Sequence, residues 1–389
     1  MRFSRRTNWN TEESELARAH RLRTAAGLPI ADLTASNPAR CGFEYSPELL
    51  AALADPRALD YDPQPRGLKP AREAVCAYYA DHGVALKPEQ IVLTTSTSEA
   101  YSFLFRLLCD PGDEVLVPSP SYPLFDFLAD IQDVRLVPYE LVYDHGWQIE
   151  FESLARAITP RSRAIMVVHP NNPTGHFTHS WELDRLNHLC SEHQLALVTD
   201  EVFLDYPIGT PAPFSFAANQ GTLTFTLSGL SKICALPQIK VAWLAASGPE
   251  ALVAEAMARL EVIADTYLSP NAPIQWAIPE LLSTGPDIQR QLNDRVATNL
   301  AALDEELARA RLVTRLAFDA GWYAVLRTPS ARSDEELAIL LLEEDSVLVH
   351  PGHFFDFPAA GFLVLSLITP VDDFREGICR LLRRIEVLT

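Results

Sequence analysis

The sequence predicts an α/β protein with a large domain, in which helices flank a mostly parallel sheet, and a smaller α+β domain. Two observations support this fold class. Short apolar segments alternate with helical patterns through the middle of the chain, and beyond Pro249 long helices rich in Ala, Leu, Glu and Arg precede short strands. Apolar segments rich in β-branched residues and separated by helices are typical of parallel strands covered on both faces.

Six apolar segments are expected to form the strands of the large domain. They are residues 91–95, 114–118, 164–170, 196–202, 222–228 and 241–246. Periodic stretches at 98–108 and 180–193 indicate helices between them. In such a sheet ligands bind beyond the carboxyl ends of the strands, so polar residues that follow these segments are the candidates for a site.

The sequence pattern changes after Pro249, where long helical stretches precede short strands. The elements expected there are helices at 251–264, 294–312, 333–344 and 371–386, with strands at 322–327, 346–352 and 362–368. Residues 1–40 are expected to join these later strands because their ASNPAR loop precedes the large sheet. We therefore expect a large domain at 41–265 and a small domain formed by 1–40 and 266–389.

Composition and charge narrow the class of protein. Hydrophobic residues make up 48% and charged residues 21%, which is ordinary for a soluble globular protein. A net charge of −19 argues against nucleic acid or an anionic membrane as the main partner. The N-terminus lacks the apolar core of a secretory signal, and no apolar stretch approaches the roughly 18 residues of a membrane span.

The six cysteines are scattered, with no C-x-x-C pair. They are Cys41, Cys76, Cys109, Cys190, Cys234 and Cys379. This pattern favours reduced thiols in a cytoplasmic protein over a disulfide or zinc framework, so no metal site is expected.

Lys232 is the first candidate for chemistry. It is one of only four lysines, and it follows the strand-like segment 222–228 and a short turn, which would place it at a strand end. Lys69 and Lys87 lie instead in segments that read as solvated loops. A lysine amine becomes nucleophilic when burial lowers its pKa, as a Schiff base requires. The plain alternative is a lysine in a surface turn.

Ser96, Thr97 and Ser98 follow the segment 91–95 and begin a helical pattern. Their hydroxyls and the free backbone N–H groups of a helix N-terminus suit a phosphate. The alternative is a capping box formed by Ser96 and Glu99, which needs no ligand.

Three further residues end predicted strands. Tyr122, between prolines, could form the floor for a flat ring, although such tyrosines usually serve packing. Asn172, in the rigid turn Asn-Asn-Pro-Thr-Gly, holds an amide in a fixed place. Asp200 ends the segment 196–202, where a buried carboxylate needs a cation or donors, or else caps the next turn.

Together these segments resemble the fold-type-I, pyridoxal-phosphate-dependent aminotransferases of class I/II, in order and spacing and over nearly the whole chain. The resemblance implies that Lys232 carries the cofactor as a Schiff base and moves a proton between the substrate and the cofactor. It implies that Asp200 pairs with the pyridinium nitrogen, which keeps the ring an electron sink. Asn172 would donate to the 3′-oxygen, and Tyr122 would stack on the ring.

The resemblance also implies phosphate, partner and substrate contacts. Ser96, Thr97, Ser98, Ser231 and Lys240 would hold the phosphate. Tyr61 would reach the phosphate of a neighbouring subunit, which implies a homodimer. Asn37 would line the substrate side, and residues 41–265 would form the cofactor-binding domain.

Three positions depart from the family pattern. Lys240 replaces an arginine that would form a bidentate contact with the phosphate. Phe203 replaces a tyrosine whose hydroxyl would bond the 3′-oxygen. Val364 stands where the family has the arginine that binds the substrate carboxylate, and it reads as a buried strand residue.

The Val364 departure leaves three explanations. Another arginine could bind the carboxylate, with Arg40 favoured and Arg66 as the second candidate. Alternatively, the substrate could be an amine without a carboxylate, or the register of that last strand could be different.

The predicted function is pyridoxal-phosphate-dependent transfer of an amino group from an amino donor to an oxo acid. The alternative is a fold-type-I lyase or decarboxylase, which would use Lys232 and Asp200 in the same way. A ligand-sensing regulator is disfavoured because residues 1–40 are too few for a DNA-binding module, and an inactive scaffold because the central residues are present.

Overall fold

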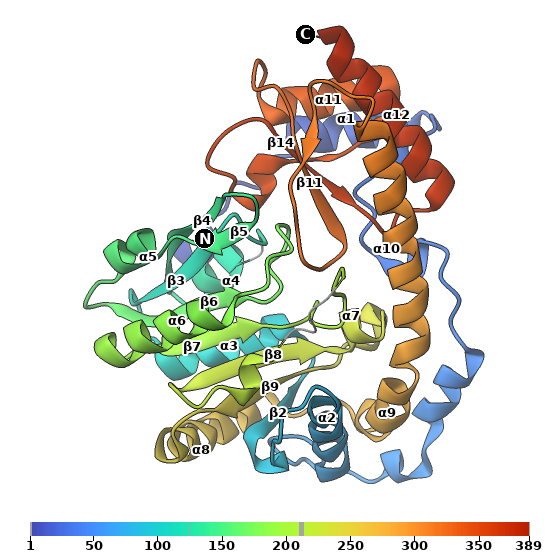
Figure 1. The fold of residues 1–389 in the computed structure, drawn as a ribbon. Helices are drawn as coiled ribbons and strands as arrows, with labels where there is room; N and C mark the ends of the chain where they lie inside the picture. Colours follow the sequence, from blue (N-terminus) through green and yellow to red (C-terminus); the bar gives the residue numbers. More distant parts are fainter. Residues whose placement is uncertain (1, 124, 210–213, 389) are drawn as a thin grey trace.

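The computed structural model describes residues 2–123, 125–209 and 214–388, and its centre is an eight-stranded sheet (Figure 1). The strand order is β2-β9-β8-β7-β6-β3-β4-β5. The strands are β2 (Ile91–Thr94), β3 (Glu114–Ser119), β4 (Arg135–Tyr143), β5 (Trp147–Ile149), β6 (Ser162–Val168), β7 (Ala196–Asp200), β8 (Thr224–Gly229) and β9 (Ala242–Ser247).

The predicted α/β class is confirmed. The run from β8 through β7, β6 and β3 to β4 is parallel, whereas β9 is antiparallel to both β2 and β8, and β5 is antiparallel to β4. All six predicted strands are present. Strands β4 and β5, at one end of the sheet, were not predicted because β4 mixes exposed, half-buried and buried residues and contains Pro138, so it has no continuous apolar segment.

Helices cover both faces of this sheet. On one face Leu104 packs with Val198 and Leu244, and on the other Leu186 packs with Leu197. Adjacent residues of β7 thus enter different cores, as the alternation of side chains along a strand requires. The helices of this part are α2 (Lys69–Asp81), α3 (Thr97–Leu108), α4 (Phe125–Ile131), α5 (Phe151–Ala157), α6 (Ser180–His193), α7 (Leu230–Ile233), α8 (Glu250–Tyr267) and α9 (Ala272–Ser283).

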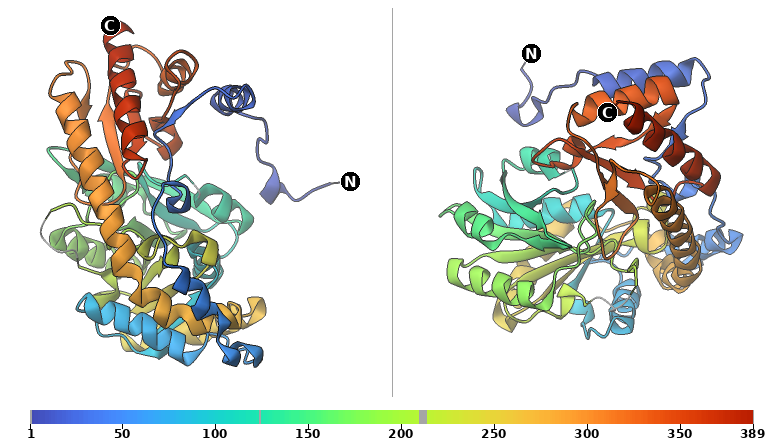
Figure 2. Two further views of the ribbon diagram at one scale, coloured as in Figure 1. Left: turned by 90° about the vertical axis from the view of Figure 1, so that its right-hand side faces the viewer. Right: turned by 45° about the horizontal axis from the view of Figure 1, so that its top comes forward.

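A second, antiparallel sheet lies above the first in Figure 1, with the strand order β10-β11-β14-β13. Its strands are β10 (Thr314–Arg315), β11 (Tyr323–Arg327), β13 (His350–Pro351) and β14 (Phe362–Ser366). The helices that accompany it are α1 (Glu15–Ala25), α11 (Asp334–Asp345) and α12 (Val371–Leu388). The long helix α10 (Gly285–Leu307) runs between the two parts along one side (Figure 2).

The N-terminal segment contacts this upper part. Strand β1 (Ala31–Asp32) pairs in parallel with β12 (Val347–Leu348), and α1 lies beside α11. Helix α9, although it follows residue 265, packs on α2 of the lower part. The domain division at residues 40/41 and 265/266 stays a prediction.

One predicted helix lies several residues earlier in the chain than expected. Helix α10 begins at Gly285 and ends at Leu307, earlier at both ends than the predicted 294–312.

All six cysteines lie among the described residues, and each is unpaired. None of the helices in the described part of the chain combines the length and the apolar character needed to cross a membrane.

Candidate active site

A cavity of about 270 Å³ opens where β6, β7 and β8 end. Residues from both parts of the molecule line it: Ser36, Thr97, Ser98, Tyr122, Phe125, Val168, Asn172, Asp200, Val202, Phe203, Ser231, Lys232 and Tyr323. This is the edge of the sheet at which the parallel strands present their carboxyl ends, where ligands bind in such folds. The structure therefore brings together seven of the predicted site residues.

Lys232 projects from the short helix α7, directly after β8. The hydroxyl of Tyr206 donates to the Lys232 carbonyl oxygen at 2.6 Å, which holds this helix in place. The Lys232 Nζ lies 5.3 Å from the ring centre of Phe203 and 5.0 Å from that of Trp322. Burial lowers the pKa of Lys232 to about 8, against the opposing effect of the Asp200 charge. A substantial neutral fraction, the nucleophilic form, therefore exists near neutral pH.

Asp200, the last residue of β7, is buried and has two donors. The hydroxyl of Tyr101 on α3 donates to its Oδ2 at 2.8 Å, and the backbone N–H of Val202 donates to its Oδ1 at 3.1 Å. Burial raises the pKa of Asp200, while these donors and Lys232 act in the opposite direction. A protonated group placed against this carboxylate would stabilise its charged form.

The turn after β6 holds Asn172 at the cavity. The Asn171 side-chain Oδ1 accepts a hydrogen bond from the Thr174 hydroxyl at 2.8 Å, and the Gly175 N–H donates to the Asn171 carbonyl at 2.7 Å. Gly175 has a φ of +67°, and a Cβ there would lie 2.4 Å from the Ala320 carbonyl oxygen, so only glycine fits. The Asn172 Oδ1 is buried, and no described residue bonds to it.

The N-terminus of α3 faces the same cavity. Thr97 and Ser98, the first two residues of α3, line it, as does Ser231. The Ser96 hydroxyl accepts from the Glu99 N–H at 3.1 Å, and Glu99 Oε2 accepts from the Thr95 N–H at 2.7 Å. The capping function foreseen for Ser96 is thus present, and Ser96 is absent from the cavity lining. The first N–H groups of a helix have no intrahelical acceptor, so they suit an anion.

Four other predicted residues lie outside the lining. Tyr61 is 82% exposed, and Asn37, Arg40 and Lys240 are also exposed. The Asn37 Oδ1 accepts from the Ala39 N–H at 3.2 Å, which caps a short helical turn. Their assignments to the phosphate and to the substrate stay predictions.

Sequence reasoning missed several residues at the cavity. Ser36 and Tyr323 come from the upper part, and Tyr101 supports Asp200 from α3. Ser36 is the immediate neighbour of the predicted Asn37, so the sequence had already indicated that this loop reaches the site. Tyr323 and Tyr101 gave none, because both lie within apolar segments that read as core.

Val364 is a buried strand residue, as expected from the sequence. It is fully buried in β14 and pairs with Val325 on one side and His350 on the other. The register around it is continuous over five residue pairs with β11, so the strand does not offer a cation at this position.

Comparisons with known proteins agree with this geometry. The sequence pattern of the family Aminotransferase class I and II matches residues 37–372. An alanine aminotransferase of Mycobacterium tuberculosis is 29% identical over 372 residues, covering 92% of this chain and 86% of that protein. The aspartate/prephenate aminotransferase of Thermus thermophilus is also 29% identical, covering 92% and 91%. An alanine aminotransferase structure from Pyrococcus furiosus has a TM-score of 0.88 at 23% identity, covering 99% and 100%, which shows the shared fold.

The match of the family pattern spans most of the chain and includes every residue that lines the cavity except Ser36. The predicted family, enzyme class and cofactor are confirmed. The chain belongs to the class I and II aminotransferases, and it is a pyridoxal-phosphate-dependent enzyme that transfers amino groups.

Proposed function

We propose that the cavity around Lys232 binds pyridoxal phosphate and moves an amino group from an α-amino acid to a 2-oxo acid. One observation carries the assignment: the half-buried amine of Lys232 and the buried carboxylate of Asp200 share one cavity with a helix N-terminus. The relatives are named for alanine, aspartate, prephenate, glutamate and pyruvate, which supports amino-acid and oxo-acid substrates.

The residues present fit this cofactor. The first N–H groups of α3, with Ser231, suit its phosphate, and the Asp200 carboxylate suits a protonated ring nitrogen. Asn172 lines the cavity, so its side-chain amide N–H is available to donate to a ring oxygen. Tyr122 lines the cavity and supplies an aromatic surface for stacking.

Lys232 has two tasks in this proposal. Its neutral amine would hold the cofactor covalently, and when free it would take the proton from the substrate α-carbon and deliver it to the cofactor. Pyridoxal phosphate, when bound, supplies an electron sink for the carbanion. The Nζ lies 5.0 Å and 5.3 Å from the ring centres of Trp322 and Phe203, which place apolar surface beside it.

Asp200 holds the charge that this chemistry needs. Its carboxylate would be stabilised in the charged form by a protonated ring nitrogen, and Tyr101 and the Val202 N–H keep its oxygens oriented. Because the site is buried, this ion pair is stronger than it would be in water. Asp200 therefore maintains the electron-withdrawing power of the ring throughout the cycle.

We assign the substrate carboxylate to Arg40, with Asn37 lining the same side. Both lie in the loop that also contributes Ser36 to the cavity. Arg66, the other candidate, already donates to Glu261 and to the Glu89 carbonyl oxygen, so it is less available. Movement of this loop towards the cavity would bring Arg40 to the substrate.

We further propose a cytoplasmic homodimer in which Tyr61 and Lys240 complete the phosphate site. Tyr61 lies on an exposed surface with Leu59 and Leu268, which are 90% and 56% exposed, and the three line a common groove. Apolar groups of this size gathered on one surface are typical of subunit interfaces. Light scattering should give twice the mass of one chain, and a monomeric active enzyme would contradict the assignment.

An absorption spectrum tests the proposed reaction. The enzyme loaded with pyridoxal phosphate should change to a pyridoxamine-type spectrum when an amino-acid donor is added, and a 2-oxo acid should restore the original spectrum. A panel that includes simple amines would show whether the α-carboxylate is needed. A spectrum that never converts with any donor would favour lyase or decarboxylase chemistry instead.

A further inference from the structure

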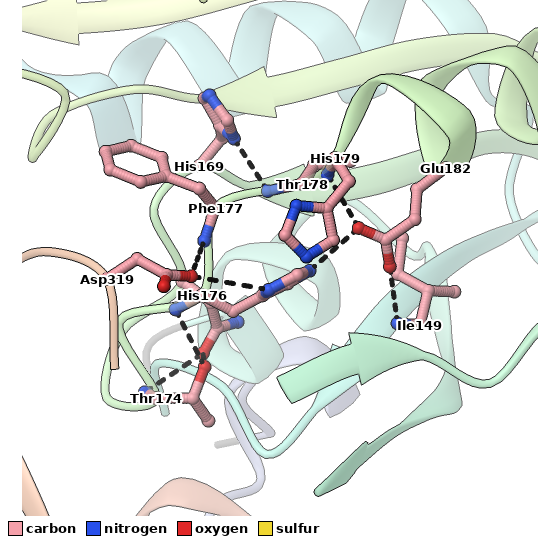
Figure 3. Close-up of polar contacts among 10 residues, drawn as sticks. Ile149, His169, Thr174, His176, Phe177, Thr178, His179, Glu182 and Asp319 are labelled. Atoms are coloured by element: carbon pink, nitrogen blue, oxygen red, sulfur yellow. Dashed lines mark hydrogen bonds and ion pairs between the residues drawn. The ribbon is translucent and has the colours of Figure 1, made fainter. Parts of the chain in front are cut away.

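A group of imidazole and carboxylate side chains lies at the start of α6, outside the lining of the active-site cavity (Figure 3). His176, His179 and Glu182 each bring one ligating atom to within 4.8 Å of the others. His176 and Glu182 are buried, whereas His179, the N-cap of α6, is exposed. Two imidazole nitrogens and one carboxylate oxygen are ligands that zinc and related divalent transition metals prefer.

Glu182 is already fixed by backbone donors. Its Oε1 accepts from the Ile149 N–H of β5 at 2.7 Å, and its Oε2 accepts from the His179 N–H at 2.7 Å (Figure 3). The carboxylate therefore needs no ordering before it binds an ion. Such preorganisation lowers the entropic cost of metal binding.

The spacing of His176 and Glu182 suits a shared ion. The His176 Nε2 lies 3.1 Å from the Glu182 Oε2. Two ligands bound to one tetrahedral zinc at about 2.1 Å lie roughly 3.4 Å apart. A displacement of a few tenths of an ångström would convert this hydrogen bond into two metal bonds. The exposed His179 ring needs only a side-chain rotation to join them.

The other ring nitrogen of His176 supports a metal on Nε2. This Nδ1 is buried without a hydrogen-bond partner among the described residues, and the Asp319 Oδ2 lies 4.0 Å from it. In a neutral ring that donates from Nε2, Nδ1 would be a bare acceptor facing a carboxylate. A metal on Nε2 leaves the proton on Nδ1, directed at Asp319, which is the usual carboxylate partner of a metal-bound histidine. The backbone N–H of Phe177 holds Asp319 in place at 3.1 Å.

We propose that His176, His179 and Glu182 bind one divalent transition-metal ion of the zinc type, with a remaining position open to water beside His179. The ion would join β5, α6 and the turn that carries Asn172, so its role is structural. The expectation of no metal site rested on cysteine spacing, which does not bear on a histidine–glutamate site. The metal-free alternative is a His176 imidazole held only by its contacts with the Glu182 and Asp319 carboxylates.

Calorimetric titration of Zn²⁺ into the full-length, chelator-treated protein tests the site. His179→Ala removes an exposed ligand with little risk to folding, and His188→Ala is its matched control on the exposed face of α6, where His188 lies 3.8 Å from Glu192. We expect one ion per chain in the unmodified protein and in the control, and at least tenfold weaker binding in His179→Ala. Absence of binding, or equal binding by His179→Ala, would overturn the proposal.

Two further measurements separate this site from the free cysteines. Zn²⁺ should raise the thermal unfolding midpoint of the unmodified protein and of His188→Ala, but not of His179→Ala, because only a ligand of the folded state stabilises it. Co²⁺ should give visible bands without the near-ultraviolet charge transfer of thiolate ligands. Thiolate bands, or a stabilisation that persists in His179→Ala, would contradict the assignment.

Discussion

The two sides of the active-site cavity differ in how they are built. The side proposed to hold the cofactor draws on the ends of neighbouring strands and on α3, and it contains the amine of Lys232 and the buried carboxylate of Asp200. The substrate side draws Ser36 from the N-terminal segment and Tyr323 from β11, and both offer neutral hydroxyls. Among the described lining residues, Lys232 is the one cation. In the proposed function, the chemistry therefore depends on a single sheet edge, while specificity depends on segments that meet only in the folded chain.

Lys232→Ala should have the largest effect, because it removes both the covalent anchor and the proton-transfer group. We expect kcat/KM to fall by about 10³-fold or more. Steady-state kinetics checks this, with Lys87→Ala as the control, since Lys87 is exposed and does not line the cavity. Retention of more than a tenth of the activity in Lys232→Ala would show that another group performs the chemistry.

The pH dependence of cofactor capture should report the buried environment of Lys232. The neutral amine reacts, and its fraction rises with pH until the pKa is passed, so a pKa of about 8 rather than 10.5 means faster capture at neutral pH. At pH 7 the neutral fraction of Lys232 is roughly 300-fold greater than that of an ordinary lysine. The rate of cofactor capture by the apoenzyme, followed by stopped-flow absorbance, should be half-maximal near pH 8 and level off above it. The rate for free lysine with a blocked α-amine should continue to rise. Coincident profiles would contradict the burial argument.

Arg40→Ala sharpens the comparison on the substrate side. A lost hydrogen-bonded charge pair costs about 1.5–3 kcal/mol, so KM for amino-acid donors should rise about 10- to 100-fold with little change in kcat. Arg18→Ala, in the exposed part of α1, is the control. Unchanged turnover of amino acids by Arg40→Ala would make that assignment wrong and would favour an amine substrate.

The sequence was informative for one side of the cavity and poor for the other. Lys232, Asp200, Asn172 and Thr97 follow recognisable strands, so their meeting at one sheet edge was predictable. Tyr323 lies within an apolar strand, and its position at the cavity depends on how the two sheets pack. That packing involves contacts between residues hundreds of positions apart, which local patterns do not encode.

Tyr101→Phe tests whether the support of Asp200 matters. The ring would keep its edge contact with Phe125, at 5.2 Å between centres, and only the hydroxyl bonded to Asp200 would be lost. Because that donor favours the charged carboxylate, its loss should raise the pKa of Asp200 and weaken cofactor binding. We expect about a tenfold fall in kcat/KM and a comparable rise in the cofactor dissociation constant. If neither constant moves, Tyr101 serves packing alone.

Phe203→Tyr should have the smallest effect. It tests whether an added hydroxyl can supply a further hydrogen bond to the cofactor. Phe203 lines the cavity and packs edge-on against Trp322, with ring centres 5.0 Å apart. A hydroxyl added there would donate to the phenolic oxygen of the bound cofactor and stabilise its ionised form. The pH midpoint of the absorption change of the loaded enzyme should therefore fall, by about one pH unit. An unchanged midpoint would mean that the added hydroxyl does not reach the ring, and that Asn172 alone serves this oxygen.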